Sequence, residues 1–427
     1  MRSLIFRLMF GVLTFGAFAP CATFGLTLRE AQELARTKNP QLHAQIKESE
    51  ANEASVTRSL SAFYPSFGVQ SRYEVFDSAF ERRRGGTGNF FAEWNVFNGL
   101  KDYAAHHERI HALAASKLQL EATRQRVDWD VEETFYRVIY HQDVLKLLNE
   151  AIARNQNQIK AAKSRRGAGV GSEADVLEFD LYDALLRSDL ATFEGQLTEA
   201  QTAFRLVLGD DSVKFPLVGE IGRSRVAASK ESVLGRVKEA NVEVKIAELE
   251  IDEAQEKQRV ATAGFLPQVK LFATYGSRGL RETVVNPETY AGVVARWELF
   301  SGFDTIAARR EAQARLSQAE TSKRTLQIST VGKADQVFTE LKAIEFRVGL
   351  EARNLKGAER YFRVVLDEYR RGVKNSPDVK SASEVFFQAL LRDVEYRYKF
   401  IAAKVELQKL MNAPIATEPM PPVQKEG

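Results

Sequence analysis

The feature that most constrains this chain is a run of 67 residues, 100–166, that contains neither glycine nor proline. Glycine and proline are the residues that most often end or kink a helix, so nothing in this run interrupts one. A helix of that length is about 100 Å long, at 1.5 Å per residue. A comparable stretch, 303–371, also lacks proline. Helices this long do not fit into a compact domain, so the sequence predicts an elongated molecule.

The chain contains two copies of one structural unit. The sequence WNVFNG at 94–99 returns as WELFSG at 297–302, which is 203 residues later. The pattern GVxxxxDV at 169–176 returns at 372–379 with the same offset. Each copy is predicted to contain a helix, two strands, a very long helix, a tight turn and a return helix.

This repeat divides the chain into five predicted parts. Residues 1–25 form a signal peptide, 26–209 the first repeat, 210–229 a linker or equatorial segment, and 230–412 the second repeat. The last part, 413–427, is rich in proline, which favours a flexible tail over a packed element.

The N-terminus has the pattern of an export signal. A short basic start precedes residues 8–19, which are almost purely apolar but too few for a membrane helix of about 20 residues. We expect cleavage after Ala22 or Gly25. Lipidation of Cys21 is the alternative, although Pro20 fits a lipidation motif poorly. Because no later stretch reaches about 18 apolar residues, any part in a membrane must consist of strands.

Composition excludes several classes of protein. Lys and Arg total 60 and Asp and Glu total 57, so the net charge of +3 does not indicate binding to nucleic acid. The single cysteine excludes a disulfide framework and a cysteine-rich metal site.

The predicted helices carry apolar seams. The first helix is expected at about 41–63 and ends before Pro65, and the return helices are expected at about 174–208 and 379–412. A strict spacing of seven predicts coiled-coil packing in the long helix and in the last return helix. The seam residues are Val131, Val138, Leu145, Ile152 and Ile159, and then Leu391, Tyr398 and Val405.

Four segments alternate between apolar and polar side chains, as strands do. Each has about ten residues, the length that a tilted strand needs to cross a bilayer. They form two predicted hairpins with polar loops at 77–88 and 276–288, expected outside the cell. Phe91 and Phe97 are exceptions that fall on a polar face. A soluble sheet with one buried face is the alternative for any single segment. The apolar faces carry Phe67, Val69, Tyr73 and Val75; Phe90, Ala92, Trp94 and Val96; Val269, Leu271, Ala273 and Tyr275; and Ala291, Val293, Ala295, Trp297 and Leu299.

Four strands cannot close a transmembrane barrel, because the smallest such barrels have about eight. An open strand edge in lipid leaves backbone polar groups without partners. If these segments span a membrane, several copies of the chain must share one barrel.

One motif points to chemistry. His107, Glu108 and His111 spell H-E-x-x-H, the pattern of a zinc-protease helix. The distant carboxylates considered as a third ligand, Glu132 and Glu133, lie on the same predicted helix, roughly 30 Å from His111. The second repeat lacks both histidines at the equivalent positions. No catalytic residue, metal or cofactor is therefore predicted, and the chain is not expected to be an enzyme.

Glycines mark the two turns between a long helix and its return helix. Residues 167–171 read GAGVG but follow a helix, which excludes a dinucleotide-binding loop. Gly169 and Gly372 are instead expected at helix ends. Asp175 and Asp378 follow these turns, where capping is the ordinary role. In a symmetric oligomer, one Asp per chain becomes a ring that selects cations.

The order and duplication of these features resemble the TolC family of outer-membrane efflux proteins. The resemblance rests on NP at 39–40, on YP and LP before the first strand of each hairpin, on FNG or FSG after the second strand, and on GVxxxxDV at both turns. It covers about residues 26–412.

The resemblance implies a mainly α-helical fold with membrane β-structure. A homotrimer is expected, with a twelve-stranded β-barrel, four strands from each chain, in the outer-membrane lipid. A long α-helical coiled-coil barrel would continue it across the periplasm. The expected function is a passive exit duct without a cofactor. Its expected partners are a periplasmic adaptor (membrane fusion protein) and an inner-membrane pump of RND, ABC or MFS type, for drug efflux or type I secretion.

The resemblance also implies that the duct closes at the periplasmic tips. Asp175, Tyr369 and Lys374 match positions that hold such an entrance closed, with Lys374 where arginine is usual. Lysine cannot make the bidentate contact of arginine, so a weaker latch is expected. Asp378 matches a constriction-ring aspartate, and Ser381 stands where a second ring aspartate is expected. We therefore expect a single ring.

Two other classes of protein stay open at the level of sequence. A soluble periplasmic coiled-coil adaptor shares long helical hairpins but not two β-hairpins of membrane length. A zinc protease would bind zinc and lose its proteolytic activity to a chelator. The cargo, whether drug, metal or protein, is not predicted.

Overall fold

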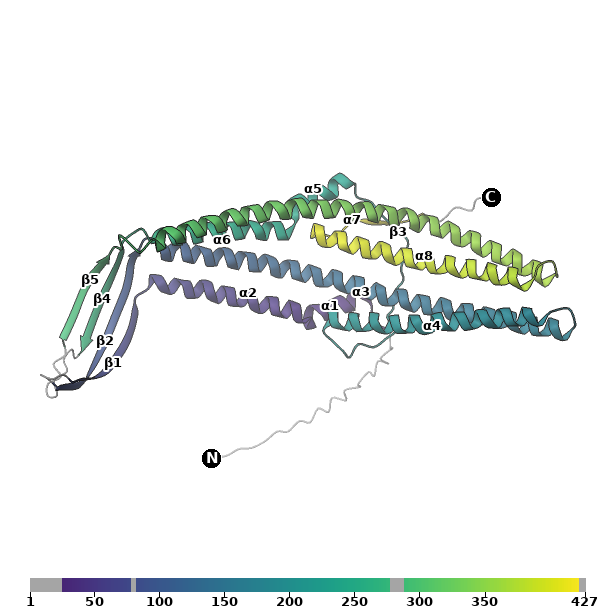
Figure 1. Cartoon of the computed structure of the whole chain (residues 1–427), viewed down its shortest axis with the longest axis horizontal. Coiled ribbons are helices and arrows are strands. Elements are labelled where there is room, and N and C mark those ends of the chain that lie inside the picture. Colours follow the sequence, from purple (N-terminus) through teal and green to yellow (C-terminus); the bar gives the residue numbers. More distant parts are fainter. Residues whose placement is uncertain (1–24, 78–81, 277–287, 422–427) are drawn as a thin grey trace, which may run out of the picture.

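The computed structural model describes residues 25–77, 82–276 and 288–421. The predicted signal peptide, with Cys21 and Ala22, lies outside these residues except for Gly25. The molecule is long and narrow, with a sheet at one end and two helical turns at the other (Figure 1). None of its helices in the described ranges is long and apolar enough to cross a membrane.

The helices follow the predicted repeat, with two short helices at the start of each copy. Their bounds are α1 Leu28–Lys38, α2 Pro40–Ser59, the 3-10 helix η1 Leu60–Phe63, α3 Lys101–Gly167, α4 Glu173–Leu208, α5 Lys230–Ala240, α6 Val242–Ala263, α7 Asp304–Arg370 and α8 Ser376–Met411. The strands are β1 Ser66–Asp77, β2 Arg82–Asn98, β3 Ser224–Val226, β4 Gln268–Gly276, β5 Glu288–Arg296 and β6 Thr417–Pro419.

The two long helices, α3 and α7, each contain 67 residues, which confirms the elongated architecture. Return helix α4 lies against α3, and α8 lies against both α7 and α3. Toward the sheet, α2, α3, α6 and α7 lie side by side in that order (Figure 1). The predicted seam is internal, since Val131 and Val138 are fully buried and Ile152 is nearly so.

The helix predicted at 41–63 is confirmed by α2 and η1, which together span residues 40–63. A separate helix, α1, precedes them because the chain breaks at Asn39. Its side-chain oxygen accepts a hydrogen bond from the N–H of Leu42 at 2.9 Å and so caps α2. Pro40 has no N–H and keeps the preceding residue extended. The Asn39 amide also donates to the carbonyl of Val207 at 2.6 Å, which ties the break to the end of α4.

The second repeat uses the same device without a proline. Asn241 accepts from the N–H of Val244 at 3.0 Å and donates to the carbonyl of Leu410 at 2.9 Å. The capping asparagine is thus the common cause of the break in both repeats.

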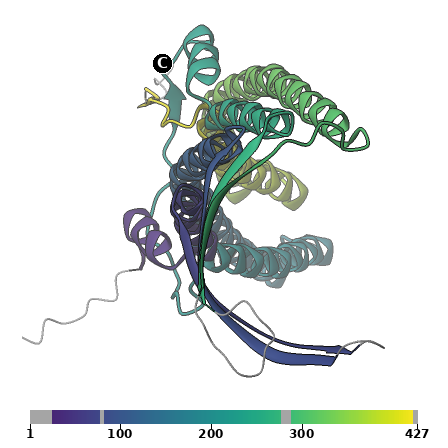
Figure 2. The ribbon, with the colours of Figure 1, turned by 90° about the vertical axis from the view of Figure 1, so that its left-hand side faces the viewer.

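The main sheet is antiparallel, with strand order β1-β2-β4-β5, and it is strongly curved (Figure 2). The predicted loop at 77–88 is wrong, because Asp77 already pairs with Arg82 and the ladder continues through Gly85, Gly86 and Gly88. These glycines resemble a turn signal, but they lie within strand β2. The second loop, at 276–288, lies almost wholly outside the described residues.

Phe97 is not an exception to the apolar face. The pairing between β2 and β4 shifts by one residue between Asn95 and Phe97, which leaves Val96 as the extra residue of a β-bulge. Phe97 therefore pairs with Val269 and shares its face. Strict alternation along β2 fails at this point because a bulge reverses the faces of the residues after it.

A second, two-stranded sheet joins the linker to the predicted tail. Strand β3 pairs with β6, with Val226 opposite Thr417 and Ser224 opposite Pro419. The flexible tail predicted for 413–427 therefore does not hold for 417–419. The linker is also held by the buried carboxylate of Asp393, which pairs with Arg223 at 2.6 Å and with Arg397 at 2.9 Å.

Candidate functional site

The two helical turns end their long helices in the same way. Gly169 and Gly372 have φ of 77° and 82°, the left-handed region that glycine adopts without strain. At the first turn, the N–H of Gly169 donates to the carbonyl of Arg166 and that of Val170 donates to Arg165, both at 3.0 Å. The second turn repeats this pattern. These are Schellman ends, which reverse the chain into the return helix.

Each return helix begins with an aspartate at its third position. Asp175 accepts a hydrogen bond from the N–H of Ser172 at 2.9 Å, and Ser172 accepts one from the N–H of Asp175 at 3.2 Å. Asp378 accepts from the N–H of Asn375 at 3.2 Å. The capping residues are therefore Ser172 and Asn375, and the aspartates complete a capping box three residues later.

Asp175 also connects the two repeats. The buried hydroxyl of Ser376, at the start of α8, donates a hydrogen bond to the Asp175 carboxylate, at the start of α4. This bond from Ser376, with that from the Ser172 N–H, holds the pKa of Asp175 below its usual value despite partial burial. The carboxylate therefore stays ionised at neutral and moderately acidic pH.

Tyr369 makes a second link between the repeats. The guanidinium of Arg165, at the end of α3, donates to the main-chain carbonyl of Tyr369 at 2.9 Å and lies 4.7 Å from the centre of its ring. Tyr369 is buried. Burial raises the pKa of its hydroxyl, which the Arg165 charge opposes and the Asp175 charge reinforces.

Lys374 lies near Asp378 rather than with Asp175 and Tyr369. Its amino group lies 4.0 Å from the carboxylate of Asp378, and both side chains are about two-fifths exposed. The structure thus brings Asp175 and Tyr369 into one cluster with Ser376 and Arg165, and it places Lys374 with Asp378. We call the first four residues the tip cluster. Whether any of these residues forms a gate stays a prediction.

Arg165 was not among the residues predicted from the sequence, and Ser376 was not predicted to belong to this cluster. A signal was present in the repeat, because Tyr369 and Ser376 correspond, at the offset of 203, to Arg166 and Glu173. Those two residues form an exposed ion pair within the first repeat. A position-by-position comparison of the repeats would have marked these sites as the places where one turn departs from the other.

The H-E-x-x-H motif lies on an ordinary helix surface. The ring of His107 lies against Tyr103, with their centres 4.3 Å apart, and His111 lies 3.9 Å from the carboxylate of Asp252. Glu108 approaches Lys257 at 3.9 Å. Within the described ranges, no three His, Cys, Asp or Glu side chains are placed to hold a metal ion.

Ion pairs also connect the repeats midway along the molecule. Lys409 on α8 pairs with Asp130 at 2.6 Å and with Glu133 at 3.1 Å on α3. Lys404, one turn earlier, pairs with Glu132 at 2.6 Å. Burial disfavours the charge of Lys409, but its bond to Asp130 and the attraction of both carboxylates raise its pKa overall. These contacts fix α8 against α3.

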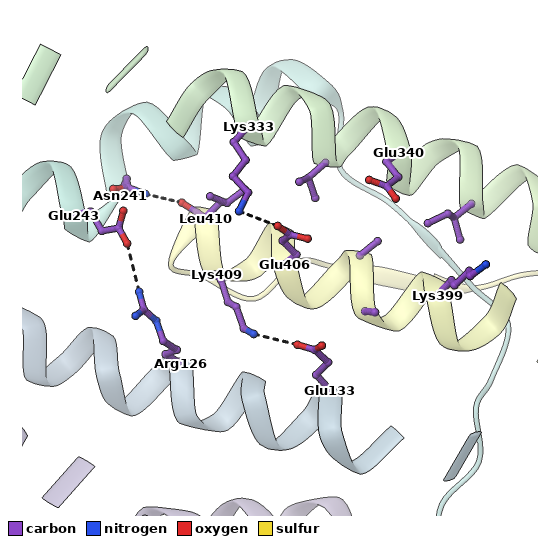
Figure 3. A pocket seen from close by; sticks show the side chains of 14 residues that line it. Arg126, Glu133, Asn241, Glu243, Lys333, Glu340, Lys399, Glu406, Lys409 and Leu410 are labelled. Atoms are coloured by element: carbon purple, nitrogen blue, oxygen red, sulfur yellow. Dashed lines mark hydrogen bonds and ion pairs between the residues drawn. The ribbon is translucent and has the colours of Figure 1, made fainter. Parts of the chain in front are cut away.

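A charged pocket of about 480 Å³ lies beside these pairs, between α3, α6, α7 and α8 (Figure 3). Arg126 reaches Glu243 at 3.4 Å across its mouth, and Lys333 reaches Glu406 at 2.9 Å. Its acidic and basic groups are largely paired with one another, so it is a joint between helices rather than a catalytic cleft.

Residues 32–210 and 233–413 match the family described as Outer membrane efflux protein. The two matched ranges correspond to the two repeats. The chain is 23% identical over 305 residues to Outer membrane protein TolC of Vibrio cholerae, which covers 68% of this chain and 69% of that protein.

Solved structures share the fold. Outer membrane protein VceC of Vibrio cholerae superposes with a TM-score of 0.79 at 15% identity, over 91% of this chain and 96% of VceC. CusC, whose structures describe transmembrane channel formation, superposes with a TM-score of 0.81 at 13% identity, over 90% of this chain and 92% of CusC.

The chain belongs to the outer membrane efflux protein family, which confirms the resemblance to TolC. It is a passive efflux channel of the outer membrane that extends into the periplasm, and it is not an enzyme. The two alternatives, a soluble adaptor and a zinc protease, are therefore wrong. Members of this family work with periplasmic adaptors and inner-membrane pumps.

Proposed function

We propose that three copies of the chain form a homotrimeric exit duct, with a twelve-stranded barrel in the outer membrane and a helical tunnel in the periplasm that closes at its tips. The observation that carries this proposal is the open sheet. In the described part of the chain, β1 pairs with β2 and β5 pairs with β4, so β1 and β5 are the two edge strands and the sheet is not closed.

These edges need partners in a membrane. Lipid offers no hydrogen bonds to a strand edge, so the cost of an open sheet is several kcal/mol for each unsatisfied group. Pairing β5 of one copy with β1 of the next satisfies both edges. Three copies then supply twelve strands, the number that the TolC resemblance implies.

The outer face of the sheet suits lipid contact. Its side chains are apolar and largely exposed in the single chain, including Phe67 at 77%, Val69 at 68% and Val293 at 64%. A contiguous apolar face of this kind marks a surface that another phase or molecule covers. The outer-membrane lipid is the proposed cover.

The proposed gate consists of the two turns and the residues around them. In a trimer, Asp378 supplies one carboxylate per chain, and three such groups form a ring that attracts cations. The tip cluster, with Asp175 and Tyr369, would hold the two helical hairpins of one chain together. Lys374 would balance part of the Asp378 charge from 4.0 Å. Opening of the duct then requires that these contacts separate.

The proposed partners are a periplasmic adaptor and an inner-membrane pump of RND, ABC or MFS type. The support is the tip surface, where Val170 and Val373 are 68% and 69% exposed at the two turns. Apolar residues at an exposed turn suit contact with another protein. The cargo stays open among drugs, metals and secreted proteins.

Extraction of the native protein tests the assembly. Outer membranes are solubilised in mild detergent, and the mass of the purified complex is measured by native mass spectrometry. We expect three copies of the mature chain and single-channel current after insertion into a planar bilayer. A monomer in the soluble periplasmic fraction would contradict the proposal.

Crosslinking in cells tests the partners. Val373→Cys, at the exposed tip, is labelled with a short crosslinker, and captured proteins are identified by mass spectrometry. The matched control is a cysteine at exposed Leu206, in the last turn of α4 and far from the tip. Capture of an adaptor by the first variant and not by the second supports docking at the tip. Equal capture by both would contradict it.

A further inference from the structure

Three aromatic side chains lie on the polar face of the main sheet, β1-β2-β4-β5. Phe91, unlike Phe97, is a true exception to the alternation on β2, because it lies before the bulge. Phe272 on β4 and Tyr290 on β5 share its face, as the strand pairings show. These rings are not accounted for by lipid contact, which involves the opposite face.

The register places the rings close together. Phe91 pairs with Gly68 on one side and with Thr274 on the other, and Thr274 pairs with Tyr290. These residues form one row across all four strands. Phe272 lies in the next row, between Glu93 and Gly292, and its ring centre is 5.2 Å from that of Tyr290.

Two of the rings reach over glycines of the neighbouring strands. A side-chain carbon added to Gly68 would approach the Phe91 ring to 2.5 Å, and one added to Gly292 would approach the Phe272 ring to 3.0 Å. Glycine in a strand marks a place where another group approaches the backbone closely. The two glycines therefore leave the room that the rings need to lie across the neighbouring strands.

This face is the inner, concave one. Side chains on the convex face of a curved sheet spread apart, whereas those on the concave face crowd together. Phe67 and Val69 on the opposite face are 77% and 68% exposed, whereas Phe91 and Phe272 are half-buried. Figure 2 shows the curl of the sheet. In a barrel closed by three copies, the rings line the duct.

Part of the charge beside the rings is balanced by an ion pair. Lys270 and Glu93, on the same face, form an ion pair across β2 and β4. The rings are therefore bordered by the Thr274 hydroxyl and by this neutralised pair, and Glu288 is the next residue of the same face beyond Tyr290 on β5.

We propose that Phe91, Phe272 and Tyr290 form an aromatic belt inside the barrel, nine rings in the trimer, that binds flat aromatic solutes as they leave the duct. The proposal rests on the proposed trimer. Aromatic rings prefer offset-stacked or edge-to-face contact with one another, which a saturated ring cannot match. The belt thus distinguishes aromatic from saturated solutes of equal charge and similar size.

Block of single-channel current tests the belt. The purified trimer in a planar bilayer receives phenethylammonium or 2-cyclohexylethylammonium from the side of the barrel. These probes carry the same charge and differ mainly in aromaticity. For the native protein, we expect half-block at a concentration about three- to tenfold lower for the aromatic probe. We expect that ratio to fall toward one in two variants. One is the double variant Phe91→Leu with Phe272→Leu, which keeps apolar side chains over the glycines. The other is Tyr290→Ser.

The control is Val294→Ser, on the same face of β5 and without a ring, which should leave the ratio unchanged. Equal block by both probes in the native protein would overturn the belt, while the current itself would leave the proposed channel standing. A preference that survives in the leucine variant would overturn the role of aromaticity. A protein that forms no channel at all would contradict the proposed function instead.

Discussion

Arg165 and Tyr369 join the ends of the two long helices. The Arg165 guanidinium donates to the Tyr369 carbonyl at 2.9 Å and lies 4.7 Å from the ring centre, although the two residues are 204 positions apart. One side chain therefore holds two helical hairpins together through a hydrogen bond and a cation–π contact. Each hairpin is formed by one copy of the repeat, so this contact connects the two copies at the tip.

Loss of this contact should loosen the closed tip. Arg165→Ala removes a charged hydrogen bond and a cation–π contact, worth about 1–3 kcal/mol per chain. Since about 1.4 kcal/mol is a factor of ten, we expect at least a severalfold rise in the closed-state conductance in a planar bilayer. The control is Arg166→Ala, which removes only an exposed ion pair with Glu173 and should change little. Equal conductance of both variants would contradict the role of Arg165.

The Asp175 carboxylate should make closure of the tip depend on pH only at low pH. Its pKa is lowered in the folded protein, so its stabilising effect is present above its ordinary pKa of about 3.9 and is lost as the pH falls through the lowered value. We expect constant closed-state conductance from about pH 8 to pH 5 and a rise below about pH 4. Asp175→Asn should remove this rise and conduct more throughout. A native rise near pH 6 would rule out Asp175 as its origin.

Asp378 should attract divalent cations to the tip. Asp378→Ala removes one carboxylate per chain and should weaken block of the single-channel current by divalent cations. The matched gain-of-charge variant is Ser381→Asp, at an exposed position three residues later, which should strengthen that block. The measurement is the concentration of added divalent cation that halves the current. Unchanged values in both variants would exclude a carboxylate ring at this position.

The two tip glycines should resist substitution. Gly169→Ala and Gly372→Ala force a side chain into a left-handed backbone, at a cost of about 1–2 kcal/mol each. We expect a lower midpoint of thermal unfolding, measured by circular dichroism in detergent. Gly167→Ala is the control, because Gly167 is the last residue of α3 and has open space around it. It should be neutral or slightly stabilising, and a loss as large as that at Gly169 would contradict the argument.

The buried carboxylate of Asp393 should matter for the linker. Asp393→Ala leaves Arg223 and Arg397 without their shared partner, and breaking a buried pair typically costs about 3–5 kcal/mol. We expect faster proteolysis of the linker and a lower midpoint of thermal unfolding. Glu418→Ala, which breaks the exposed pair with Arg225, should cost less than about 1 kcal/mol. Similar losses in both variants would show that burial is not the cause.

Much of the fold follows from local patterns. The absence of glycine and proline from 100–166 predicts α3 to within one residue, because helix continuity depends on neighbouring residues. The offset of 203 residues predicts the duplication, and alternation predicts the lipid face of the sheet. Each of these signals is contained within a short window of sequence, so each can be recognised without knowledge of distant contacts.

The sequence by itself therefore determined the repeat, the long helices, the membrane strands and the family. Only the tertiary structure decided that Asp175 binds Ser376, that Arg165 covers Tyr369, and that the bulge at Val96 returns Phe97 to the apolar face. It also decided that Phe91 and Phe272 lie over glycines of neighbouring strands. The reason is that these relationships depend on the register between elements distant in sequence, and one shift of register moves a side chain to the opposite face.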